Sequence, residues 1–377
     1  MTVFSGFGAL IGPAKILLTQ DMFKDKTLAI DISCWFHQLF SKNRSEVEFV
    51  NAISWRAEKL DGMEVKAIYV FDGKPNPDKK LEDDRRAAER QKKTNSNMAI
   101  PWDFRMAAFK ALHEKGHDAI FARHEADHQC AHLVRTGKAD AVMSVDFDHL
   151  TLGVSMITKV KWSKHGVVSA QLFSLENFKK WTPDRVFPCM AINWFLELIA
   201  RLGADAFMIA SLLLKCDYIK KIDGFGNAKL KSLAPHLEGG TPRHIMDAFR
   251  KWLESGDRSA QRFANHINDK LEKDLTFAYN AFMYPPVFDV EERHLRRLNE
   301  CPDDVDEAAL VPLDDGDWLR THGAMFIRGR SRGGDACLED GDLRPLLEYY
   351  LSKPEEINGN LGFMGPAALG VWGGVAG

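Results

Sequence analysis

Short apolar runs alternate with stretches of helical periodicity from the start of the chain to about Val168. Runs of about four to eight apolar residues are typical of buried strands, and apolar residues that recur every three or four positions indicate helices. The alternation predicts an α/β fold, in which a central, mostly parallel sheet is flanked by helices. We expect strands at Thr27–Ile30, Lys66–Phe71, Asp118–Phe121, Ala139–Val145 and Ser155–Lys161, a hairpin turn at Trp162–Gly166, a strand at Val167–Phe173, and helices between Pro188 and His236.

Acidic residues follow several of these runs, where a parallel strand reaches the carboxyl edge of the sheet. Asp31 ends the first run, Asp72 ends the second, and Asp146 and Asp148 follow Val145. Ligands of open α/β sheets bind at this edge. A lone Asp in such a place is usually a turn residue or a helix cap. Asp146 and Asp148, however, would point the same way in an extended segment and repel each other unless a cation lies between them.

Three further acids extend the pattern. Glu125 and Asp127 have the same spacing and precede the helical run His128–Val134, and Asp217 follows the apolar run that ends at Leu214. Helix capping would account well for one acid of the Glu125 pair and less well for both. Because a hard divalent cation takes about six oxygen ligands, the seven acids together predict a divalent-metal site.

Composition limits the other possibilities. A chain of 377 residues with 45% hydrophobic and 27% charged residues is typical of a globular protein with a sizeable core. The net charge of −3 does not by itself indicate a nucleic-acid partner, although metal-bound acids would mask a basic surface elsewhere. The six cysteines form no Cys-x-x-Cys pair and no signal peptide is seen, which favours reduced thiols in an intracellular protein. The apolar stretch Gly8–Leu18 is too short to span a bilayer, so no membrane is expected.

A polar, basic segment follows Asp72. Asn76 and Pro77 form a typical helix start, and good helix formers continue to Lys93. Lys79 and Arg86 are two helical turns apart on one face, from which both could reach back over Asp72 and bind a phosphate. A solvated helix with internal ion pairs is an equal alternative.

A second basic constellation surrounds Gly224-Phe-Gly226. The two glycines separate helical segments, and their amides with the next helix N-terminus could bind an anion, assisted by Lys229 and Lys231. Such a site would hold a DNA phosphate without reading sequence. Glycines between helices are more often only a turn, but Asp217 lies shortly before them in the same region.

Five ordered motifs resemble those of the Rad2/XPG structure-specific nucleases. They are Ala29–His37, Tyr69–Lys74, Glu125–Asp127, Val145–Gly153 and the segment from Cys216 to Gly226. All seven acids match positions of that family's metal site. Within the family the likeness is to exonuclease 1, because of Cys34-Trp-Phe-His37, of Asp127 as the second acid of its pair, and of Phe277–Asp289 with Asp303–Asp306.

The resemblance implies a PIN-like 5′ nuclease fold with a helix–two-turn–helix element and a C-terminal segment that wraps around the core. It implies a 5′-to-3′ exodeoxyribonuclease with flap endonuclease activity, which uses two Mg²⁺ ions roughly 4 Å apart, with Mn²⁺ as a substitute. Asp31, Asp72, Glu125 and Asp127 would form one side of the site, and Asp146, Asp148 and Asp217 the other. The resemblance also implies that Lys79 and Arg86 are catalytic residues that bind the scissile phosphate. The DNA contacts that it implies are Gly6, His37, Lys79, Arg86, Gly224, Gly226, Lys229 and Lys231.

The resemblance further implies duplex DNA with a nick, gap, recessed 5′ end or 5′ flap as the partner, a K⁺ ion at the Gly224–Gly226 turn, a monomer, and a nuclear location. No clamp-binding motif is seen in the sequence. Lys220 and Lys221 would add to the hold on the duplex, and Trp35 is expected in the core. The alternatives are a flap endonuclease proper, a catalytically weak nucleic-acid-binding relative, and an RNA-directed nuclease of the PIN-like class.

Four regions are expected along the chain. Residues 1–93 would form the N-terminal nuclease region with the basic helix, and residues 94–240 the internal nuclease region, with the helix–two-turn–helix at about 206–236. Residues 241–350 would form a C-terminal packing segment. Residues 351–377 would form a tail with few features that fold alone. The stretch after Arg90 is shorter than the helical arch of the family.

Overall fold

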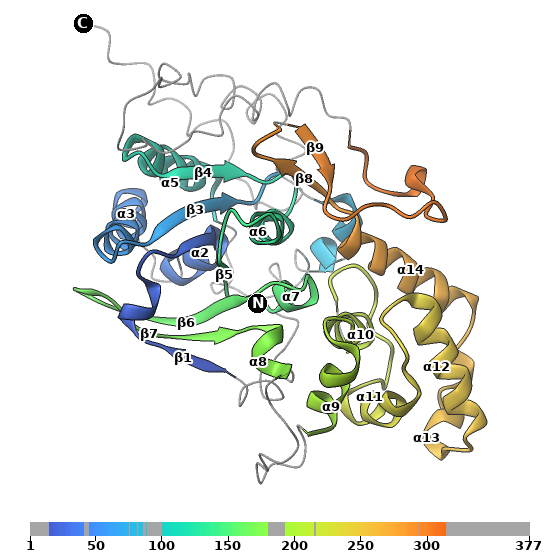
Figure 1. Cartoon of the computed structure of the whole chain (residues 1–377). Helices are drawn as coiled ribbons and strands as arrows, with labels where there is room; N and C mark the ends of the chain where they lie inside the picture. Colours follow the sequence, from blue (N-terminus) through green and yellow to red (C-terminus); the bar gives the residue numbers. More distant parts are fainter. Residues whose placement is uncertain are drawn as a thin grey trace, which may run out of the picture.

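A computed structural model describes residues 15–40, 45–74, 76–80, 82–85, 88, 100–179, 193–214, 216–292 and 294–313. Its centre is a seven-stranded sheet with the strand order β1-β7-β6-β5-β2-β3-β4 (Figure 1). The strands are β1 (Ile16–Leu18), β2 (Thr27–Asp31), β3 (Lys66–Phe71), β4 (Asp118–Phe121), β5 (Ala141–Met143), β6 (Met156–Ser163) and β7 (Gly166–Phe173).

Five neighbouring strands of this sheet run in parallel. Strand β2 pairs in parallel with both β3 and β5, and β4 and β6 extend the parallel set at either side. At one edge, β7 pairs antiparallel with both β6 and β1, so β7 alone runs against the other strands of this sheet. The predicted mostly parallel sheet is therefore confirmed, and the carboxyl ends of β2 to β6 lie at one edge.

Aromatic side chains fill the layer between the sheet and the helices that cover one of its faces. Phe71 of β3 makes an edge-to-face contact with Phe36 of α2 (Ile32–Phe40) and with Phe109 of α5 (Trp102–Glu114). Between them in sequence, α3 (Glu46–Gly62) begins with a capping box, in which Ser45 and Glu48 exchange hydrogen bonds. This layer fixes the direction in which β3 delivers its last residues.

Strand β3 is buried on its other face as well. Because side chains alternate along a strand, Val70 points away from the Phe71 layer, and it is fully buried. Helix α6 (Ala126–Arg135) packs against β2, β3 and β5, and α7 (Asp148–Thr151) packs beside α6. The sheet is thus flanked by helices, as expected for an α/β fold.

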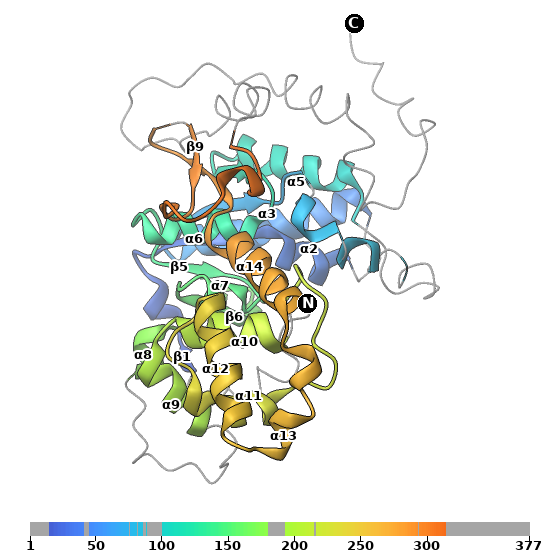
Figure 2. The ribbon, with the colours of Figure 1, turned by 90° about the vertical axis from the view of Figure 1, so that its right-hand side faces the viewer.

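A group of helices lies beside the sheet (Figure 2). Helix α10 packs against α7, so the group adjoins the carboxyl edge of the sheet. Its members are α9 (Asn193–Leu202), α10 (Asp205–Leu214), α11 (Asn227–Leu233), α12 (Pro242–Glu254), α13 (Arg258–Gln261) and α14 (Asp269–Met283), and α8 (Leu175–Lys179) precedes them. The predicted helical region is interrupted at residues 216–226 by a loop.

The hairpin of β8 (Pro286–Asp289) and β9 (His294–Arg297) returns to the sheet side of the molecule and packs on α6 (Figure 1). The Gln129 side chain amide of α6 donates a hydrogen bond to the Phe288 carbonyl at 2.9 Å and accepts one from the Phe288 N–H at 2.8 Å. All four groups are buried. One buried amide side chain therefore fixes this hairpin to the helix that begins at the carboxyl edge.

Within the part of the chain that the structure describes, no helix has the length and apolar character needed to cross a membrane. The described cysteines Cys34, Cys130, Cys216 and Cys301 are free thiols, as predicted for them.

Candidate metal centre

The seven predicted acids are delivered to the carboxyl edge by five different parts of the fold. Asp31 is the last residue of β2, Asp72 follows β3, and Asp148 is the first residue of α7, shortly after β5. Glu125 is the N-cap residue of α6, and Asp127 lies in its first turn. Asp146 precedes α7, and Asp217 lies just after α10.

Two sets of side chains at this edge are close enough to hold a cation each. The Asp31 set consists of Asp31, Asp127 and His149, and the Asp146 set consists of Asp127, Asp146 and Asp148. Within each set the potential ligand atoms lie within 4.8 Å of one another. Asp127 belongs to both sets, so the two possible cation positions are adjacent.

Hydrogen bonds fix the carboxylates of Asp31 and Asp72. The Ser144 hydroxyl donates to Asp31 Oδ2 at 2.8 Å, and the Ser33 N–H donates to Asp31 Oδ1 at 3.0 Å. Asp72 accepts a hydrogen bond from the Ser33 hydroxyl and one from the Ala126 N–H at 2.9 Å. Ser33 therefore joins the carboxylates of Asp31 and Asp72, which are 41 positions apart in the chain.

Gly73 allows the chain after β3 to approach the chain after β4. Its N–H donates to the His124 carbonyl at 2.7 Å. A Cβ at this position would lie only 1.9 Å from the Ala122 carbonyl oxygen. A side chain would therefore separate Asp72 from the start of α6, where Glu125 and Asp127 lie.

Lys79 connects the remaining two acids. Its Nζ lies 2.6 Å from Glu125 Oε2 and 3.7 Å from Asp217 Oδ2, and the Lys79 side chain is only 7% exposed. The ammonium also lies 5.2 Å from the centre of the Tyr218 ring. Lys79 is held in a single turn of 3₁₀ helix, Pro77–Lys79, which the Asn76 side chain caps. The structure thus brings Lys79 to the predicted acids, whereas Arg86 lies outside the described residues.

Burial dominates the electrostatics of the centre. Desolvation, with the charges of Asp127 and Asp72, raises the pKa of Asp31 to about 8. Burial also raises the pKa of Glu125 to about 7, although Lys79 opposes the shift. Desolvation and the neighbouring Asp146 raise the pKa of Asp148 well above its usual range.

Asp127 is the exception among the acids. Burial alone would raise its pKa, but the adjacent His149, together with the charges of Lys79 and His128, outweighs burial, and the pKa of Asp127 falls well below its usual range. Burial would lower the pKa of His149 in turn, and Asp127 raises it instead. Asp127 and His149 therefore favour each other's charged form.

The surroundings of Asp148 Oδ1 show whether a divalent cation fits the centre. Asp148 is 3% exposed, and its Oδ1 makes no hydrogen bond to any described residue. A buried polar atom without a partner is costly in free energy. The donors around it are carboxylate oxygens, which are the preferred ligands of hard divalent cations. The residues present therefore fit such a cation.

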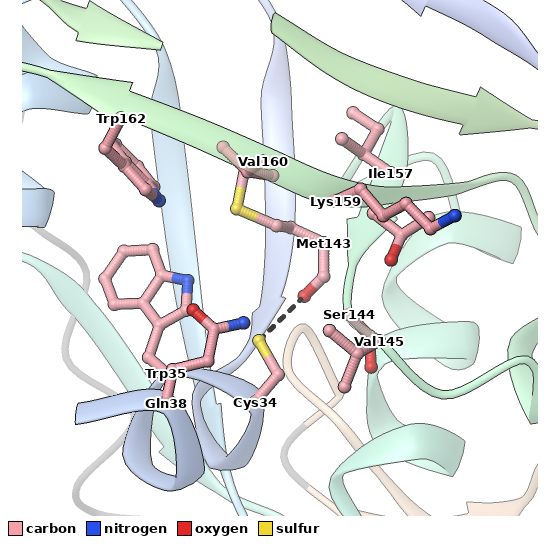
Figure 3. Close-up of a pocket in the computed structure, with 11 residues that line it drawn as sticks. Cys34, Trp35, Gln38, Met143, Ser144, Val145, Ile157, Lys159, Val160 and Trp162 are labelled. Atoms are coloured by element: carbon pink, nitrogen blue, oxygen red, sulfur yellow. Dashed lines mark hydrogen bonds between the residues drawn. The ribbon is translucent and has the colours of Figure 1, made fainter. Parts of the chain in front are cut away.

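A pocket lies behind Ser144, between α2 and β6 (Figure 3). Trp35, Gln38, Lys159 and Trp162 contribute to its lining, and the Cys34 thiol is directed at the Met143 carbonyl, with Sγ 3.9 Å from the oxygen. Its cavity volume is about 10 Å³, which is room for about one water molecule. The pocket is too small to bind a nucleotide.

The predicted DNA contacts are spread over the surface. His37 is exposed on α2, and Trp35 is buried in the core beside Tyr69 and Trp162, as expected. Gly224 has φ = +71°, and Gly226 is the N-cap residue of α11. Around this turn, Lys220, Lys221 and Lys231 are exposed, and Lys229 Nζ lies 5.7 Å from the centre of the Phe263 ring. Gly6 lies outside the described residues.

His149 was not predicted from the sequence. It directly follows Asp148 and reads as a core position of the run His149–Thr151. Its ring reaches the Asp31 set because α7 begins at Asp148 and turns the next side chain toward α6. A histidine next to a two-acid motif was the only available signal, and it is a weak one because most buried histidines serve packing.

The fold and the carboxylate-lined edge define a class, namely α/β proteins that carry a metal centre at the carboxyl ends of a parallel sheet. Residues 3–93 match the XPG N-terminal domain, and residues 116–190 match the XPG I-region. These two matches bear out the resemblance to the XPG/Rad2 family that the ordered motifs predicted.

The curated relatives include exonucleases and flap endonucleases. Exonuclease 1 of Xenopus laevis is 25% identical over 315 residues, which cover 76% of this chain and 39% of that protein. Flap endonuclease 1 of Entamoeba histolytica is 27% identical over 310 residues, which cover 73% of each chain. The chain thus spans well under half the length of the exonuclease 1 that it matches.

The solved structure of the catalytic core of Rad2 in complex with a DNA substrate has a similar fold. Its TM-score is 0.54 at 21% sequence identity, over 74% of this chain and 86% of that one. This likeness confirms the predicted mostly parallel sheet flanked by helices, and the helix–two-turn–helix element stays a prediction.

Proposed function

We propose that this protein is a metal-dependent nuclease that hydrolyses DNA phosphodiesters near a 5′ end, as a 5′-to-3′ exonuclease with flap endonuclease activity. The convergence of seven carboxylates on one edge of the sheet carries this proposal. The Asp31 and Asp146 sets would hold two Mg²⁺ ions, with Mn²⁺ as a substitute, and Asp72, Glu125 and Asp217 would complete their surroundings. Bound cations of this kind activate a water molecule and stabilise a leaving oxygen.

Lys79 would bind the scissile phosphate together with Arg86. In the structure the Lys79 ammonium neutralises Glu125 and Asp217. Once metal neutralises these carboxylates, the ammonium would be available to a phosphate oxygen a short distance away. Loss of Lys79 should then lower kcat more than it changes KM, because the contact strengthens as charge develops.

The loop between α10 and α11 would hold the duplex, with a K⁺ ion at Gly224–Gly226. Lys220, Lys221 and Lys231 are exposed there and could reach phosphates. Replacing one of them with Gln should weaken duplex binding for all sequences and reduce the slope of log K against log salt by about 0.9. Lys110 on α5, whose side chain is 53% exposed, offers a matched control that should leave the slope unchanged.

The activity is tested with three DNA substrates in Mg²⁺, each labelled at a 5′ end. They are a blunt duplex, a duplex with a recessed 5′ end, and the same duplex with a 5′ flap. Asp146→Asn removes one charge of the Asp146 set. Asp140→Asn is its control, because Asp140 directly precedes β5 at the opposite edge of the sheet, where its carboxylate accepts a hydrogen bond from the Thr27 N–H and Asn can do the same.

Release of mononucleotides by the wild type and the control, and not by Asp146→Asn, would support the proposal. Cleavage of the flap alone would assign the protein to the flap endonucleases. Cleavage of a matched RNA duplex in preference to DNA would make it an RNA-directed nuclease. Binding of every substrate without cleavage would refute the enzymatic proposal.

A further inference from the structure

His149 lies inside the centre and is of a different chemical type from the seven acids. Its side chain is 0% exposed, and its Nε2 lies 2.9 Å from Asp127 Oδ1. The contact is an ion pair when the ring is protonated, and neither ring nitrogen makes a hydrogen bond to a described residue. The buried nitrogen that faces Asp127 is thus also within reach of a cation that Asp31 and Asp127 would share.

The spacing of the Asp31 set matches the spacing of ligands around one cation. Ligand atoms at about 2.1 Å from a metal lie about 3 Å apart when adjacent and about 4.2 Å apart when opposite. The Nε2–Oδ1 distance of 2.9 Å fits an adjacent pair. The limit of 4.8 Å over Asp31, Asp127 and His149 is compatible with the whole set around one ion.

We propose that His149 is a direct nitrogen ligand of the cation held by Asp31 and Asp127. This inference rests on the proposed metal centre and specifies which cation it prefers. Mg²⁺ favours an all-oxygen surrounding, whereas imidazole nitrogen favours first-row transition cations. The Asp31 set therefore binds a cation such as Mn²⁺ or Co²⁺ more tightly than Mg²⁺, whereas the Asp146 set, which has only oxygen donors, shows no such gain.

The rival explanation is that the His149 ring only packs beside Asp127 and keeps its carboxylate in place. Both explanations predict a loss of activity when His149 is replaced, so activity cannot separate them. A measurement that identifies the atoms bound to the metal can separate the two explanations.

The decisive experiment is pulsed electron paramagnetic resonance of the full chain, freed of metal with a chelator and loaded with Mn²⁺. The wild type should show the hyperfine coupling of one directly bound ¹⁴N nucleus, which changes to the ¹⁵N pattern in protein made with ¹⁵N-histidine. His149→Gln should bind Mn²⁺ without this coupling. His128→Gln is the matched control, because His128 is also buried next to Asp127 but its Nε2 faces the Tyr218 hydroxyl at 3.4 Å.

A second measurement uses calorimetry to compare metal affinities. In His149→Gln the affinity for Co²⁺ should fall by at least about tenfold relative to the affinity for Mg²⁺. In His128→Gln the ratio should stay that of the wild type.

The outcomes separate the two proposals. Mn²⁺ bound by the wild type without a nitrogen coupling would overturn the role of His149 and leave the metal-dependent nuclease standing. No binding of Mn²⁺ or Mg²⁺ would overturn both. A coupling that survives in His149→Gln and disappears in His128→Gln would assign the ligand to the wrong histidine and also overturn the inference. If His149→Gln fails to fold, a nitrogen coupling that persists in His128→Gln still supports His149, and a wild type without any nitrogen coupling still overturns the inference.

Discussion

Replacing Lys79 with Met should destabilise the metal-free protein in a pH-dependent way. Met has a similar length and fills the same space, but it leaves Glu125 and Asp217 without their shared cation. Removing one partner of a buried ion pair costs about 3–5 kcal/mol. Because the Glu125 side chain is 24% exposed, water relieves part of this cost, and we expect a loss of about 3 kcal/mol at pH 8.

The pH dependence follows from Glu125, whose pKa is raised to about 7 in the folded protein from an ordinary 4.5. The attraction between Lys79 and Glu125 exists only while the carboxyl group is ionised. In the folded protein Glu125 is protonated below about pH 7, so its attraction to Lys79 is present above pH 7 and is lost as the pH falls below 7. At pH 5 the difference between Lys79→Met and the wild type should be clearly smaller than at pH 8.

The free energy of unfolding is measured by urea titration with far-ultraviolet circular dichroism, in the presence of a chelator. Lys110→Met is the control, because the Lys110–Glu114 pair is more than half exposed on both sides and should contribute less than about 0.5 kcal/mol. A loss below about 1 kcal/mol at pH 8 would refute the buried-pair reasoning. An equal loss at pH 5 and pH 8 would show that packing, and not charge, explains the effect.

Three further predictions concern the centre and its supports. Mg²⁺ binding at pH 7 should release protons, because the pKa of Asp31 is raised to about 8 and metal binds the ionised form; calorimetry in buffers of different ionisation enthalpy measures this, and identical heats would contradict it. Gly73→Ala should lower the free energy of unfolding by about 1–3 kcal/mol or more, whereas Gly62→Ala, which meets no atom within 4 Å, should not; a thermal melt with an unchanged Gly73→Ala midpoint would argue against the close approach. Gln129→Met should leave the buried N–H and C=O of Phe288 unpaired at a cost of about 2 kcal/mol or more, and limited proteolysis should then cut first near the β8–β9 hairpin; cleavage at wild-type rates would show that other contacts hold it.

Much of the sheet could be predicted because apolar runs of strand length are bounded by polar residues. The ranges of β3 and β4 match the expected ones, and β5 is shorter because pairing with β2 begins only at Ala141. Strand β1 was missed, since Ile16 and Leu17 are exposed in a three-residue edge strand that lies far in sequence from its partner β7. Long-range antiparallel pairing of a short segment leaves no local pattern.

The acids of the centre could be predicted because parallel strands place their ends at one edge, whatever the fold does elsewhere. The direction in which a single side chain points could not be predicted from the sequence. Lys79 was expected over a phosphate, and its contacts with Glu125 and Asp217 depend on where α6 and α10 come to lie. His149 was missed for the same reason, since its neighbours Asp31 and Asp127 precede it by many residues and meet it only in the folded sheet.

The position of Asp217 has a consequence for the order in which the centre is assembled. Six of the acids belong to the sheet and to helices α6 and α7, but the seventh follows α10 in the adjoining group of helices. During synthesis, Lys79 emerges long before either of the carboxylates that hold it in the finished molecule. A nascent or truncated chain that ends between residues 174 and 216 contains all seven strands of the sheet and every residue of the Asp31 and Asp146 sets. It lacks the carboxylate through which the adjoining group of helices contacts Lys79.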